Sequence, residues 1–108
     1  MNSFLKTYTP LLFFFLLTAC DKGYKVRVAN YYTETLDSVV IGNNKIVFTG
    51  IESTLTTDFK SIGKGKYAVT FISKKKNKFY TELHIPSTGT GQRTLQIDAI
   101  EQISVLEE

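Results

Sequence analysis

The sequence predicts an all-β fold, an antiparallel sandwich of about seven strands, on three observations. Apolar and polar residues alternate over much of the chain, as in Tyr24, Val26 and Val28 against Lys25 and Arg27. Turn-forming residues recur about every 8–12 positions, which is the spacing typical of sandwiches and barrels. No segment combines apolar residues at helical spacing with capping residues.

The expected strands follow one another with short connections. They lie around residues 24–28, 36–41, 46–48, 55–59, 67–72, 79–85 and 95–99, and residues 103–105 extend the last strand or add another. Asn43-Asn44 predicts a turn because asparagine tolerates positive φ. Lys74-Lys75-Lys76-Asn77 predicts a polar hairpin tip, and residues 86–92 predict a loop. The chain therefore has one domain after its first residues.

The first nineteen residues have a different character. Lys6 stands near the N-terminus, and residues 11–17 read Leu-Leu-Phe-Phe-Phe-Leu-Leu, so part of the 43% hydrophobic content lies here. This run is shorter than the roughly 20 residues that span a bilayer, and the pattern is typical of a secretory signal peptide. Leu17-Thr18-Ala19-Cys20 resembles the lipobox of bacterial lipoproteins. The resemblance implies cleavage before Cys20 and attachment of lipid to Cys20, which anchors the protein in a membrane.

Two other interpretations of these residues are an ordinary signal peptide followed by an incidental thiol, and a buried apolar helix. Cys20 is the only cysteine and stands where the apolar run ends, which favours the lipobox. A single cysteine also excludes a disulfide framework and a multi-cysteine zinc site. We therefore expect a signal peptide at 1–19, a lipidated cysteine with a short tether at 20–23, and a β-sandwich domain at 24–108.

The short tether predicts that the domain lies close to the membrane. Three residues, 21–23, separate Cys20 from the first expected strand and span at most about 10 Å. Asp21 resembles an inner-membrane retention signal of some enteric bacteria, but the same residue has no such meaning in other groups. The predicted location is the bacterial cell envelope, at the periplasmic face or the outer surface.

A local motif refines the fold class. Gly65 and Tyr67 precede the alternating strand that contains Val69, and this resembles the entry to a late strand in transthyretin-like and other immunoglobulin-like sandwiches. In those folds the glycine permits a tight corner, and the tyrosine covers the edge of the core with its hydroxyl near backbone groups. The resemblance implies an immunoglobulin-like or transthyretin-like architecture, which by itself does not define a function.

Residues for catalysis or cofactor binding are scarce. His84 is the only histidine, and the alternation places it on the outer face of its strand with Glu82 and Tyr80. Two ligating side chains are too few for a structural zinc site, so we expect no metal and no cofactor. Residues 89–94, Gly-Thr-Gly-Gln-Arg-Thr, lack the spacing of a phosphate-binding loop and precede no helix. We expect no enzymatic activity.

Two sets of side chains are candidates for binding. Tyr31, Tyr32, Tyr80 and His84 could form an aromatic contact surface for a protein or a glycan, although packing at the sandwich edge explains the tyrosines equally well. A basic patch of four lysines could attract anions, although lysines also keep strand edges soluble; it comprises Lys74, Lys75, Lys76 and Lys78. A second group of lysines comprises Lys60, Lys64 and Lys66.

The sequence therefore favours a small, lipid-anchored envelope protein that acts as a non-enzymatic binding or assembly module. Its expected partners are the membrane, through the N-terminal lipid, and another envelope protein or a glycan, but not nucleic acid, because arginine is scarce. Two alternatives remain open. One is a structural, fimbria-like subunit that pairs strand edges, and the other is a hydrolase inhibitor that uses loop 86–92 or tip 74–78.

Overall fold

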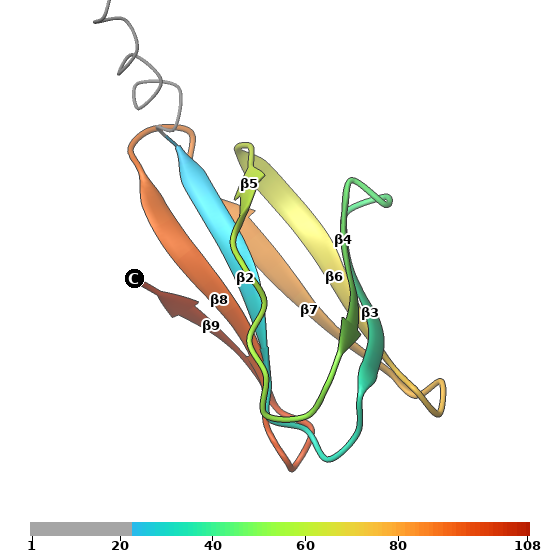
Figure 1. The fold of residues 1–108 in the computed structure, drawn as a ribbon. Coiled ribbons are helices and arrows are strands. Elements are labelled where there is room, and N and C mark those ends of the chain that lie inside the picture. Colours follow the sequence, from blue (N-terminus) through green and yellow to red (C-terminus); the bar gives the residue numbers. More distant parts are fainter. Residues whose placement is uncertain (1–22) are drawn as a thin grey trace, which may run out of the picture.

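The computed structural model of the chain describes residues 23–108. The predicted signal peptide and Cys20 lie outside the described residues. Figure 1 shows that residues 23–108 form two sheets packed face to face. Within them no helix is long and apolar enough to cross a membrane.

Eight strands build the described part of the chain, so the predicted all-β sandwich is confirmed with one strand more than expected. They are β2 (Tyr24–Asn30), β3 (Leu36–Ile41), β4 (Ile46–Ile51), β5 (Lys60–Ile62), β6 (Gly65–Ser73), β7 (Lys78–Ile85), β8 (Gly91–Ile97) and β9 (Ile103–Glu107). Two strands lie outside the seven expected ones, the short β5 and β9 with the alternating Ile103 and Val105, while the strand expected at 55–59 does not form.

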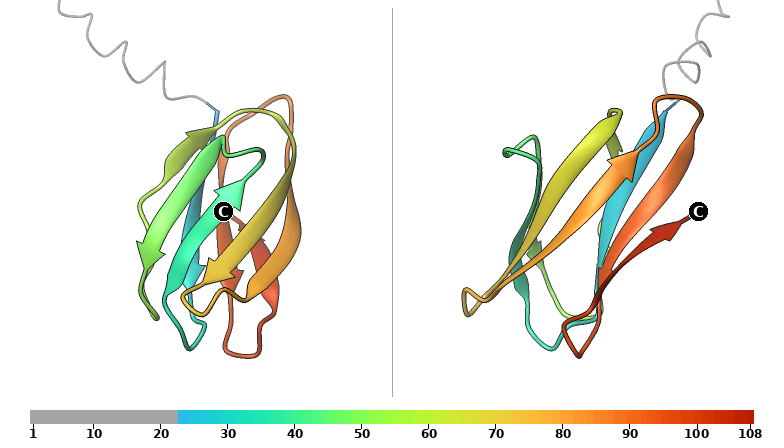
Figure 2. Two further views of the ribbon diagram at one scale, coloured as in Figure 1. Left: turned by 90° about the vertical axis from the view of Figure 1, so that its right-hand side faces the viewer. Right: turned by 180° about the vertical axis from the view of Figure 1, so that it is seen from behind.

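The strands form two four-stranded sheets, ordered β5-β2-β8-β9 and β4-β3-β6-β7 (Figure 2). All neighbours are antiparallel except β2 and β8, which run parallel from Tyr24 opposite Gly91 to Asn30 opposite Ile97. The expectation of a wholly antiparallel sandwich is therefore wrong for this pair. In a constant-type immunoglobulin sandwich the first two strands share a sheet, whereas here β2 and β3 belong to different sheets.

The core lies between the sheets and contains aliphatic and aromatic side chains from both. Phe71 in β6 is fully buried and pairs with Val39 in β3 and Phe79 in β7. The alternation in the sequence predicts these inward faces, because successive side chains of a strand point to opposite sides of a sheet. Val26 and Val28 of β2 are likewise fully buried. Residues from 23 onward thus supply both sheets and the core between them.

Two predicted strand segments are wrong. Residues 55–59 form no strand apart from one isolated bridge between Thr56 and Ala29, and Leu55 is half exposed. The Thr57 hydroxyl instead accepts a hydrogen bond from the Val28 backbone at 3.0 Å, so a polar side chain takes the place of a ladder bond. The strand expected to reach Ala99 ends at Ile97. The Asp98 carboxylate accepts hydrogen bonds from two backbone amides after it, which forms a turn.

The motif at Gly65 and Tyr67 has the expected geometry. Gly65 has a φ of 135°, which favours glycine, and it begins β6 directly after a tight corner. The Tyr67 hydroxyl lies 2.9 Å from the Gly63 carbonyl and 3.2 Å from the Lys64 carbonyl, while its ring packs against the core. The tyrosine therefore fixes this corner to the sandwich.

The two ends of the sandwich carry different connections. At the end where β2 begins, which we call the entry end, lie the turns 42–45 and 63–64 and the connection 86–90 (Figures 1 and 2). At the opposite end, the far end, lie the connections 31–35, 74–77 and 98–102. The tether predicted from the sequence joins the domain at the entry end.

Candidate binding surfaces

The outer face of β7 presents an exposed row of polar and aromatic side chains. Tyr80, Glu82 and His84 are all exposed, and Tyr80 retains 69% of its surface. The intervening side chains Leu83 and Ile85 are buried in the core. His84 therefore faces outward with Glu82 and Tyr80, as predicted.

The neighbouring strand gives this row little cover. Tyr80 stands opposite Thr70 and Glu82 opposite Ala68, and both partners in β6 are small. His84 stands opposite Lys66. Tyr80 and His84 are four residues apart on one strand face, which separates them by about 13 Å. Within residues 23–108 no three metal-ligating side chains gather into a group that could hold a metal ion.

Tyr32 does not belong to this surface. It retains only 5% of its surface, and its ring meets Phe79 edge-on with the ring centroids 5.3 Å apart. Its hydroxyl donates a hydrogen bond to the Glu101 carboxylate at 3.1 Å. Burial raises the pKa of the Tyr32 hydroxyl, and the hydrogen bond to Glu101 and that carboxylate's charge raise it further. The packing alternative is thus the correct one for Tyr32.

Tyr31 is 48% exposed and belongs to a connection, not to the row on β7. It follows β2 in the connection 31–35 at the far end, where its backbone amide donates to the Ile97 carbonyl at 2.9 Å. Tyr80 lies on the edge strand of the other sheet. The structure therefore divides the predicted aromatic group into Tyr80 and His84 on β7, an exposed Tyr31 in the connection after β2, and a buried Tyr32.

The lysine tip lies at the far end and is partly neutralised. The Lys76 ammonium is 2.6 Å from Asp37, and the Lys75 ammonium is 4.0 Å from Glu34. Exposed ion pairs of this kind contribute little stability, but they place carboxylates directly beside the cations. The tip is a weaker attractor of anions than its sequence suggests.

Another group of lysines gathers at the entry end. Lys45, Lys64 and Lys66 line an open depression of about 340 Å³ together with Gly42, Asn43, Gly65, Tyr67 and Ala68. None of the three makes an ion pair with another residue of the range 23–108. Lys64 and Lys66 stand out in the sequence, but Lys45 belongs to a distant turn. Lys45 joins Lys64 and Lys66 because the turns 42–45 and 63–64 lie at the same end of the sandwich, which the sequence does not indicate.

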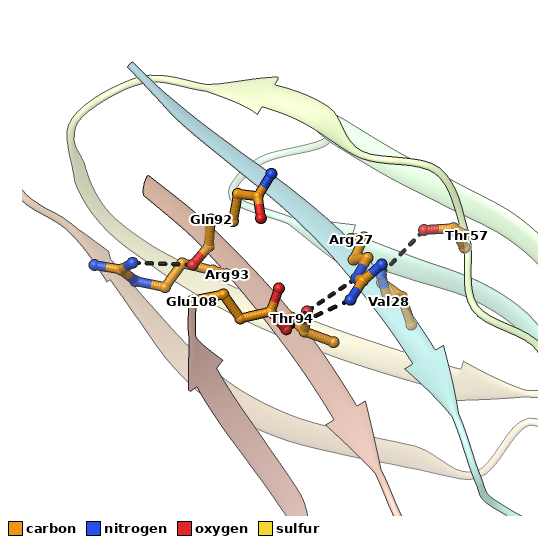
Figure 3. Close-up of polar contacts among 7 residues, drawn as sticks. All are labelled: Arg27, Val28, Thr57, Gln92, Arg93, Thr94 and Glu108. Carbon is orange, nitrogen blue, oxygen red and sulfur yellow. Dashed lines mark hydrogen bonds and ion pairs between the residues drawn. The ribbon is translucent and has the colours of Figure 1, made fainter. Parts of the chain in front are cut away.

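A polar cluster lies on the outer face of the sheet β5-β2-β8-β9 (Figure 3). Arg27 in β2 donates from Nε to the Thr94 hydroxyl at 3.0 Å, and its Nη2 lies 3.4 Å from Glu108. The Thr94 hydroxyl donates to the same Glu108 carboxylate at 2.9 Å. The Arg27 guanidinium also lies 4.5 Å from the centre of the Phe59 ring. These hydrogen bonds join β2, β8 and Glu108, so the cluster has a structural role.

Comparison with known proteins supports the fold and no more. No protein-family model and no curated protein sequence matches the chain. A solved structure described as the NMR structure of the protein from Eubacterium rectale is similar, with a TM-score of 0.51 and 12% sequence identity. The match covers 79% of this chain and 87% of the other. At this identity the likeness concerns the arrangement of the strands only.

Proposed function

We propose that this chain is a small, lipid-anchored protein of the bacterial cell envelope, and that its sandwich is a non-enzymatic binding module. The lipobox Leu17-Thr18-Ala19-Cys20 supports the anchor. The entry of the chain at Tyr24 supports a domain held within about 10 Å of the lipid. We also infer that the sandwich is transthyretin-like, because β2 and β3 lie in different sheets and Gly65 and Tyr67 form the expected corner.

The observation that carries the binding role is the exposed face of β7. Tyr80 keeps 69% of its surface and projects beside Thr70 and Ala68, so its ring is available to a partner. Tyrosine combines a large apolar surface with a hydrogen-bonding hydroxyl, which makes it frequent at contact sites for proteins and glycans. His84 adds a second polar group on the same face.

To test this role, the full chain and its variants are cross-linked to their partners in bacterial envelopes, and the captured amounts are compared. We expect the variant Tyr80→Ala/His84→Ala to capture at most about one tenth of the protein or glycan that the unaltered chain captures. The control Gln102→Ala changes an exposed residue of the far end and is expected to retain the partner fully. Equal capture by the unaltered chain and the double variant contradicts a binding role for this face.

A structural subunit is the second candidate, and the edges of the sheets favour it. β7 has eight residues and β9 five, and each forms one of the two edges of its sheet within residues 23–108. Unpaired edge strands can pair with another chain. For the mature chain with Cys20→Ser, a mass above that of one chain in light scattering supports the subunit role. A single-chain mass at high concentration supports the binding module instead.

A further inference from the structure

The entry end of the sandwich concentrates unpaired positive charge. The turns 42–45 and 63–64 bring Lys45 and Lys64 to this end, and Lys66 follows in the first residues of β6. All three line the same open depression. The three connections at this end contain no aspartate or glutamate.

Backbone contacts hold the depression in shape. The Gly42 amide donates to the Ala68 carbonyl at 2.8 Å, which fixes the turn 42–45 against β6. A side chain at Gly42, where φ is 71°, would place its first carbon 3.2 Å from the Tyr67 ring, so glycine permits this approach. The Tyr67 hydroxyl in turn binds the carbonyls of Gly63 and Lys64. The ammonium groups therefore project from a frame that is already formed.

The carboxylates nearest to this end do not cancel the charge. Glu108 is paired with Arg27 on the outer face of the other sheet. Glu107 stands opposite Arg93 in the ladder between β8 and β9. Glu82 stands opposite Ala68, and the closer partner of Lys66 across the ladder is His84.

The far end carries balanced charge, with three lysines and three carboxylates in the connections 31–35, 74–77 and 98–102. The carboxylates are Glu34, Asp98 and Glu101, and two lysines of the tip pair with carboxylates, Lys75 with Glu34 and Lys76 with Asp37. The two ends thus differ in charge although both contain lysines. This asymmetry gives the domain a preferred orientation in an electric field normal to a membrane.

We propose that the entry end binds the phosphate groups of anionic membrane lipids through Lys45, Lys64 and Lys66. The inference rests on the proposed anchor, since the tether joins the domain at this end and keeps it within about 10 Å of the lipid at Cys20. The Debye length at physiological ionic strength is about 8 Å, so these lysines attract anionic headgroups when the entry end lies against the bilayer. The domain then lies with its entry end against the bilayer and its far end away from it.

The test uses the mature chain, residues 20–108, with Cys20→Ser, so that no lipid contributes to binding. Its partition onto vesicles of phosphatidylglycerol and phosphatidylcholine is compared with that onto pure phosphatidylcholine vesicles at low salt. We expect binding only to the anionic vesicles and a weakening of roughly fivefold for each lysine removed. Lys45→Gln/Lys64→Gln/Lys66→Gln is thus expected to bind roughly a hundredfold more weakly.

The matched control is Lys74→Gln/Lys75→Gln/Lys76→Gln, which removes the same charge from the far end. We expect it to bind the anionic vesicles nearly as well as the parent chain, and circular dichroism checks that both variants are folded. Equal weakening in both variants, equal binding to neutral vesicles, or no binding overturns the proposal. Inorganic phosphate provides a further arm: NMR shifts at Lys45, Lys64 and Lys66 without vesicle binding indicate a site for free anions and overturn the membrane role.

This experiment does not depend on lipidation. A chain that binds anionic vesicles but carries no lipid in the cell contradicts the anchor and leaves the basic surface in place. A chain that is lipidated but ignores anionic vesicles contradicts only the basic surface. The two proposals can therefore fail separately.

Discussion

Replacement of Asn30 by alanine is expected to lower the free energy of unfolding by about 3 kcal/mol or more. Asn30 is fully buried at the end of β2, and its side chain makes three hydrogen bonds. The amide nitrogen donates to the carbonyls of Ile51 at 2.8 Å and Glu34 at 3.0 Å, and the amide oxygen accepts from the Tyr32 backbone at 2.9 Å. Alanine leaves three backbone groups without these partners, and buried unpaired groups are costly.

This loss is large for so small a domain, whose total stability is expected to be roughly 4–13 kcal/mol. Urea unfolding followed by circular dichroism measures it. The control Asn43→Ala removes an exposed side chain from the turn 42–45 and is expected to change the free energy of unfolding by less than about 0.5 kcal/mol. A loss below about 1 kcal/mol for Asn30→Ala would contradict the role given to its hydrogen bonds.

Phe71→Ala is expected to have a comparable or larger effect. The ring is fully buried in the middle of β6, between the ladders to β3 and β7. Alanine leaves an apolar cavity where the ring was. We therefore expect the free energy of unfolding to fall by about 3–5 kcal/mol. Urea unfolding again provides the measurement.

Two further variants keep this prediction testable if the alanine variant does not fold. Phe71→Leu retains most of the apolar volume and is expected to lose about 1.5 kcal/mol or less if neighbouring side chains repack. Tyr80→Ala removes a similar ring from the exposed face of the adjacent strand and is expected to change stability by less than about 0.5 kcal/mol. Equal losses for Phe71→Ala and Tyr80→Ala would mean that the inward and outward faces are misassigned.

Alternation made much of this fold predictable from the sequence. A strand with one buried face must alternate, so Val26 with Val28 and Leu83 with Ile85 identify their faces without any knowledge of partners. The same rule places Tyr80 and His84 on the outside, which is where the structure has them. Local chemistry also identified the corner at Gly65 and Tyr67, because its hydrogen bonds span only a few residues.

Features that depend on distant partners could not be predicted in this way. Leu55 and Phe59 alternate with polar residues as strand residues do. Residues 55–57 nevertheless meet β2 only at one isolated bridge, and a regular ladder with β2 begins at Lys60. The parallel pairing of β2 with β8 joins segments far apart in the chain, and alternation does not indicate strand direction. Tyr32 is buried through contacts with Phe79 and Glu101, and the sequence around Tyr32 does not predict these contacts.

The candidate binding surfaces also differ in how far the sequence predicts them. Exposure of Tyr80 is a property of one strand and was predictable, whereas the meeting of Lys45 with Lys64 and Lys66 requires two turns to lie side by side. The lysine tip was predicted as a basic patch from its own sequence alone. Its carboxylate neighbours Glu34 and Asp37 come from the connection after β2 and from β3.

We propose that Cys20 carries the lipid that attaches this domain to a membrane. Mass spectrometry of the N-terminal peptide of the mature protein, isolated from bacterial membranes, measures this directly. We expect a peptide that begins at Cys20 and carries a diacylglyceryl group on sulfur, and we expect Cys20→Ser to lose both the group and the membrane association. A mature chain that begins elsewhere, or that begins at Cys20 with a free thiol, would contradict the proposed lipid anchor.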